Sequence, residues 1–157
     1  LDNIANDKGR LLVITNAMFS RDPEKILLET TFLGKTFLYE TDFGSNVARS
    51  IDTVLDFLPI CAIDETKFLG YDYIESENNL KMMNLDINTS DLKTIAEKVF
   101  DSNGIVINPN RITCTVTGSV LINLEITGKN TWYVLNNNKI EELSIFQDAN
   151  EIAVRQY

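Results

Sequence analysis

The chain has 157 residues, of which 44% are hydrophobic, and a formal charge of −9 at pH 7. This length suits one domain with an apolar core, so we expect residues 1–157 to form a single domain. The acidic balance and the lack of a Lys/Arg cluster argue against a nucleic-acid or anionic-membrane surface, because both need grouped cations.

The first third of the sequence predicts an arm, a strand and a helix. Residues 1–9 are polar and mixed, which predicts a flexible arm, and the apolar run at 11–14 predicts a short buried strand. Pro23 follows capping residues and precedes an apolar run, so the pattern predicts a helix over about 23–33 that ends at Gly34.

The middle of the chain predicts a second helix and a pair of strands. After an alternating segment that turns at residues 42–44, apolar residues recur at helical spacing and predict a helix over about 46–58: Val47, Ile51, Val54, Leu55 and Leu58. Two strands are expected near 71–75 and 80–87.

The most regular pattern lies between residues 90 and 136. Ser90 is placed to cap a helix over about 91–101, whose apolar stripe consists of Leu92, Ile95, Ala96, Val99 and Phe100. Alternating residues and a turn at Gly118 then predict an antiparallel meander over about 105–136. The predicted fold class is therefore α+β, mainly an antiparallel sheet with two or three amphipathic helices.

Catalytic and cofactor motifs are lacking in the sequence. There is no histidine, which excludes Ser-His-Asp and Cys-His catalysis and imidazole-based zinc sites. The seven glycines form neither a dinucleotide fingerprint nor a phosphate loop. We therefore predict a protein that is not an enzyme and that has no cofactor.

Cysteines and carboxylates give no further site. Cys61 and Cys114 can form at most one disulfide and have the neighbours of small buried hydrophobic residues. Carboxylate pairs such as Asp64 and Glu65 are typical of a solvated face in a chain with 23 acids. Asn84, Asp86 and Asn88 match the start of a calcium loop, but Thr89 stands where that loop needs Gly, so no metal site is predicted.

Three aromatic residues are candidate anchors of a protein interface, where aromatic side chains are enriched: Tyr71, Tyr73 and Trp132. The alternative is that these side chains pack into the sheet.

Two motifs resemble a known family. The first motif is the turn Asn108-Pro109-Asn110-Arg111-Ile112 after a predicted helix, and the second is the segment of residues 27–35 followed by Asp42-Phe43-Gly44. They are similar to segments of the small wedge protein that initiates the sheath of contractile phage baseplates. One difference is the Asn at position 108, where that family has Glu. The resemblance implies a docking role for Gly34, Phe43, Gly44, Pro109, Arg111 and Ile112.

The expected function is that of a structural or assembly component of a large complex, namely a phage tail or baseplate protein. Its partners would be other protein subunits in an oligomer or hetero-complex, with no nucleic acid and no membrane. Its expected location is the virion or the host cytoplasm, because the sequence has no recognisable signal peptide. The alternative is an acidic module of the immunity or inhibitor type that masks a basic partner surface.

Overall fold

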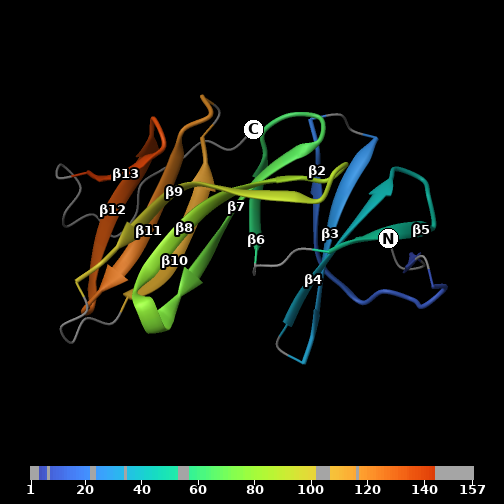
Figure 1. The fold of residues 1–157 in the computed structure, drawn as a ribbon, viewed down its shortest axis with the longest axis horizontal. Helices are drawn as coiled ribbons and strands as arrows, with labels where there is room; N and C mark the ends of the chain where they lie inside the picture. Colours follow the sequence, from blue (N-terminus) through green and yellow to red (C-terminus); the bar gives the residue numbers. More distant parts are fainter. Residues whose placement is uncertain are drawn as a thin grey trace. The chain divides into compact units, whose positions relative to one another are not determined.

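The computed structural model describes residues 4–6, 8–21, 24–33, 35–52, 57–101, 107–115 and 117–143. In these residues the chain is almost entirely β-strand, and its one helix is the 3-10 turn η1 (Glu75–Glu77) (Figure 1). The strands are β1 (Ala5–Asn6), β2 (Ile14–Phe19), β3 (Lys25–Phe32), β4 (Lys35–Asp42), β5 (Val47–Ile51), β6 (Leu58–Ala62), β7 (Lys67–Ile74), β8 (Asn79–Asp86), β9 (Asp91–Val99), β10 (Ile107–Cys114), β11 (Val120–Ile126), β12 (Lys129–Asn136) and β13 (Lys139–Glu142).

These strands form three sheets of similar topology. The sheet orders are β1-β5-β4-β3-β2, β6-β7-β8-β9 and β10-β11-β12-β13, so each sheet contains four strands that are consecutive in the chain. The four-strand runs begin at residues 14, 58 and 107, which are 44 and 49 residues apart. A four-stranded sheet that recurs about every 40 to 50 residues is the building unit of β-propellers.

The chain divides into two compact units, which we describe separately. Unit 1 consists of Leu1–Gly70 and Met83–Lys93, and unit 2 of Tyr71–Met82 and Thr94–Tyr157. The boundary therefore crosses β7, β8 and β9.

Unit 1 has apolar clusters on both faces of the β1–β5 sheet. Leu27 belongs to a cluster with Leu38, Ile51, Phe57, Phe68, Met83, Leu85 and Ile87. Its neighbours on β3 belong to the other cluster, whose buried members are Ile4, Ile26, Leu28 and Ala48. Successive strand residues point to opposite faces, so a continuous apolar run on β3 is what a sheet buried on both faces requires.

Unit 2 has its core on β11 and β12. Val120, Ile122 and Leu124 are buried on alternate positions of β11. The ring of Tyr133 meets that of Phe100 edge to face, with centroids 5.8 Å apart and planes at 81°. The meander expected over about 105–136 is present as β10, β11 and β12, with β13 as an additional strand.

The three predicted helices, and with them the α+β class, are wrong. The segment predicted as the 23–33 helix contains β3, the 46–58 segment contains β5 and the start of β6, and the 91–101 segment contains β9. Residues 22, 23 and 53–56 lie outside the described residues.

The β9 error has a clear physical cause. Leu92, Ala96 and Phe100 are four residues apart, and this spacing places side chains on one face of a helix and equally on one face of a strand. Ser90 does not cap a helix; its φ of 61° belongs to the turn that leads into β9.

Candidate functional site

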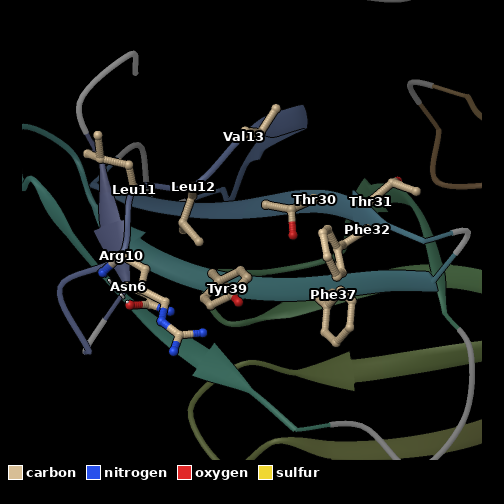
Figure 2. Close-up of a pocket in the computed structure, with 10 residues that line it drawn as sticks. All are labelled: Asn6, Arg10, Leu11, Leu12, Val13, Thr30, Thr31, Phe32, Phe37 and Tyr39. Atoms are coloured by element: carbon tan, nitrogen blue, oxygen red, sulfur yellow. Dashed lines mark hydrogen bonds between the residues drawn. The ribbon is translucent and has the colours of Figure 1, made fainter.

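A groove of about 580 Å³ opens on unit 1, over one face of the β1–β5 sheet (Figure 2). This volume is typical of ligand pockets. The groove is lined by Asn6, Arg10, Leu11, Leu12 and Val13 from the N-terminal segment, Thr30, Thr31 and Phe32 from β3, and Phe37 and Tyr39 from β4.

The floor of the groove is set by the register of β3 and β4. Thr30 pairs with Phe37 and Leu28 pairs with Tyr39, so these four residues share one face of the sheet. Phe37 and Tyr39 are two residues apart on one strand, so their positions are about 6.8 Å apart along it. The floor is therefore an aromatic surface supported by the buried cluster that contains Leu28.

The wall of the groove is a small hairpin between residues 4 and 12. Ala5 forms an antiparallel bridge with Leu11, and the Leu12 N–H donates to the Ile4 carbonyl at 2.9 Å. The Asn6 side-chain oxygen accepts from the Arg10 N–H at 2.9 Å, which fixes the turn. Ile4 is buried in the sheet's apolar cluster, so the wall is anchored to the floor.

The groove exposes large apolar side chains. Phe32 is 67% exposed and Phe37 43%, while Leu11 and Val13 in the N-terminal segment are 72% and 79% exposed. Single exposed apolar residues are common on proteins, but a contiguous exposed apolar patch marks an interaction surface.

The charge of the groove is opposite to that of the chain. Among the lining residues that the structure describes, Arg10 is the one charged residue and none is a carboxylate, although the chain carries −9. Arg10 is exposed, and its guanidinium makes no ion pair or side-chain hydrogen bond within the part of the chain that the structure describes. Lys35, also exposed, lies opposite Phe32 in the strand register.

The ionisable groups with shifted pKa values lie outside the groove. Backbone N–H groups of Thr66 and Lys67 donate to the Asp64 carboxylate at 2.9 and 2.8 Å and lower its pKa. Asp64 thus orders a turn before β7. Burial, with a smaller contribution from Glu75, raises the pKa of Tyr73, whose hydroxyl donates to the Asn78 side chain at 2.9 Å.

The structure does not assemble the residues that the sequence singled out into one site. Phe43 is 70% exposed beside Phe19, with ring centroids 6.3 Å apart, and Gly44 follows it in the β4–β5 turn with φ of 82°. Gly34 lies outside the described residues. Pro109, Arg111 and Ile112 lie on β10, where the register shifts between Pro109 and Arg111.

The aromatic candidates lie on two strands. Tyr71 and Tyr73 are half-buried on β7, and Trp132 is only 2% exposed on β12. None of the candidates within the described residues lines the groove.

Sequence reasoning missed the groove residues for a specific reason. The run at 11–14 was expected to be a buried strand, yet Leu11 and Val13 are exposed and line the groove. The alternation of Phe37 and Tyr39 was the available signal, but exposure depends on which face of the sheet the rest of the chain covers.

Features of a metal site or a reactive thiol are lacking in the described residues. No group of three or more acidic or Cys side chains there could hold a metal ion, and neither Cys61 nor Cys114 is a free thiol. In the same residues, no helix is long and apolar enough to cross a membrane.

Comparisons with known proteins give similarity in fold. No family model and no curated protein matches the sequence. The solved structure of TolB from Acinetobacter baumannii matches with a TM-score of 0.56 and 16% identity, over 86% of this chain and 33% of that chain. A protein assigned as TolB in Agrobacterium tumefaciens matches with a TM-score of 0.57 and 12% identity, over 86% of this chain and 50% of that one.

This chain thus spans between a third and a half of these two structures, and at such identities the likeness concerns the fold alone. The similar structures are TolB proteins and not baseplate proteins, so the comparison gives no support to the expected assignment to a virion, phage tail or baseplate. The segment before Pro109 that the resemblance required as a helix contains β9.

Proposed function

We propose that this chain is a non-enzymatic protein-binding module whose interaction surface is the groove on the β1–β5 sheet. The observation that carries the proposal is the exposed apolar lining: Leu11, Val13, Phe32 and Phe37. Aromatic residues at the centre of an interface supply much of its binding energy.

The rigidity of the groove supports the same proposal. Phe32 and Phe37 lie on paired strands, and the wall is held by backbone hydrogen bonds and by buried Ile4. A preformed surface loses little conformational entropy when a partner binds. The groove therefore favours recognition of a partner without prior rearrangement.

The test is selection of binding peptides from a random library on the intact chain, followed by affinity measurement on variants. We expect selected peptides to lose at least about tenfold in affinity for a Phe32→Ser/Phe37→Ser variant, since truncating a central aromatic costs about 2 kcal/mol or more. Phe43→Ser is the control, because Phe43 is 70% exposed, close to the 67% of Phe32, and is not among the groove residues.

Equal losses in the groove variant and the control would contradict the proposal, as would a library that yields no binder. Circular dichroism of each variant checks that the fold is retained.

The charge of −9 supports a second candidate, a module that masks a basic partner. Association through opposite charges weakens as salt rises, because ions screen exposed charges beyond about 8 Å at physiological ionic strength. Binding to a basic protein such as lysozyme that is unchanged between low and high salt would count against this candidate.

A further inference from the structure

We propose that the groove recognises an extended acidic-apolar peptide segment, with its carboxylate at Arg10 and its large apolar side chain at Phe32 and Phe37. This inference rests on the proposed function and adds the chemical class of the partner. It follows from the different chemistry of the two ends of the groove.

The two ends are visible in Figure 2. Arg10 and Asn6 lie at one end, Phe32 and Phe37 lie at the other, and Tyr39 lies between them. A ligand that fills the groove therefore meets a guanidinium at one end and aromatic rings at the other.

The cationic end is available for an anion. The turn that positions Arg10 uses its backbone N–H and carbonyl, which bond to Asn6, and leaves the guanidinium without a partner in the described residues. A guanidinium presents several donors in a fixed plane and binds carboxylates with two parallel hydrogen bonds. The described residues of the lining include no carboxylate that could compete for it.

The aromatic end requires an apolar group. Phe32 and Phe37 present their rings to solvent beside Thr30, and water is displaced from them most favourably by an apolar side chain. Phe37 and Tyr39 are about 6.8 Å apart along β4 and Arg10 lies beyond Tyr39 (Figure 2), so an extended peptide would place its acidic residue about two to four residues from its apolar one.

The charge of the groove favours an acidic peptide over a second copy of the chain as the ligand. In a symmetric dimer the same surface patch faces itself. The described lining of each groove carries Arg10 and no carboxylate, so two grooves would meet with like charges, which disfavours that pairing.

The experiment measures fluorescence anisotropy with three labelled peptides of equal length in which Asp, Asn or Lys precedes Phe by three residues. The wild-type chain should bind the Asp peptide about tenfold more tightly than the Asn peptide, and the Lys peptide least. Arg10→Gln should remove the preference for Asp over Asn, and Arg10→Glu should reverse the order of the Asp and Lys peptides.

Lys8→Gln is the matched control. Lys8 is an exposed cation on the same hairpin and does not line the groove, so this variant should keep the wild-type preference. Raising the salt concentration should reduce the preference for the Asp peptide and leave the affinity of the Asn peptide nearly unchanged.

The outcomes separate the inference from the proposed function. Groove-dependent binding with the same affinity for all three peptides, or an Arg10→Gln variant that keeps the Asp preference, overturns the acidic-apolar assignment and leaves a protein-binding groove. A loss of preference in Lys8→Gln equal to that in Arg10→Gln also overturns it. Failure of all three peptides to bind overturns the assignment, whereas the proposed function is overturned only if the random library also yields no binder.

Discussion

Replacing Gly70 with Ala tests how closely β7 approaches the chain before β6. Gly70 is buried in the middle of β7, and a Cβ at this position would overlap the edge of the Phe57 ring and lie 2.5 Å from the Leu58 carbonyl oxygen. Phe57 is only 1% exposed, so its ring has no free space to enter. The carbonyl belongs to the backbone and cannot rotate away.

The expected cost follows from this geometry. Overpacking by one methyl group in a filled core costs about 1–3 kcal/mol, and two obstacles, one of them backbone, place Gly70→Ala near 3 kcal/mol. For a chain of this size that corresponds to a fall in melting temperature of about 6–12 °C. Thermal and urea unfolding, followed by circular dichroism, measure both quantities.

A double-mutant cycle isolates the ring contact. Phe57→Ala alone should cost about 3–5 kcal/mol because it leaves a cavity. Adding Gly70→Ala to that variant should cost about 1–3 kcal/mol less than adding it to the wild type, because the ring no longer obstructs the methyl group. A Gly70→Ala protein that melts within about 2 °C of the wild type would refute the packing argument.

The remaining predictions concern an ion pair whose Arg49 side chain is 47% exposed, a buried tyrosine and a turn. Arg49→Met should lower the free energy of unfolding, measured in urea, by about 1.5–3 kcal/mol. Arg49 bonds Glu40 at 3.0 Å and also the Ile87 carbonyl just after β8, and the Glu40 side chain is 14% exposed. Lys67→Met removes one partner of a half-exposed pair and should cost below about 1 kcal/mol. Burial, helped by a neighbouring carboxylate, raises the pKa of Tyr133 to about 12. The unfolded chain therefore releases this proton first, so stability should fall between pH 10 and 12 by at most about 2.7 kcal/mol, and Tyr133→Phe should remove that part of the pH dependence. Gly128→Ala, with φ of 78° and open space around the Cβ, should cost about 1 kcal/mol through backbone strain alone, measured by thermal unfolding.

The strands of the C-terminal meander could be predicted because their sequence has a period of two. Val120, Ile122 and Leu124 alternate with other residues, and Gly118 and Gly128 mark the turns with positive φ. Local chemistry was sufficient there, since both the turn residues and the alternation are short-range signals.

The sequence pattern alone could not exclude a helix in the N-terminal part of the chain. Ile26, Leu27 and Leu28 form a continuous apolar run, which fits a helix as well as a strand that is buried on both faces. Only the presence of apolar partners on both sides of β3 decides between them, and those partners come from segments as distant as residues 4 and 87. The repeat of four-stranded sheets is likewise a property of topology, because no sequence motif recurs with it.

The groove itself is a consequence of the register that builds the core. Leu27 and Leu38 point to the face that is covered by the larger apolar cluster of unit 1. Because strand side chains alternate, the same register places Phe37 and Tyr39 on the opposite face. A slip of one residue in β4 would expose Leu38 to the groove and move Phe37 into the core, so folding energy fixes which aromatic residues the groove presents. The binding surface is thus set before any partner arrives, and substitutions that loosen the core beneath it, such as at Leu38, should weaken peptide binding without touching the groove lining.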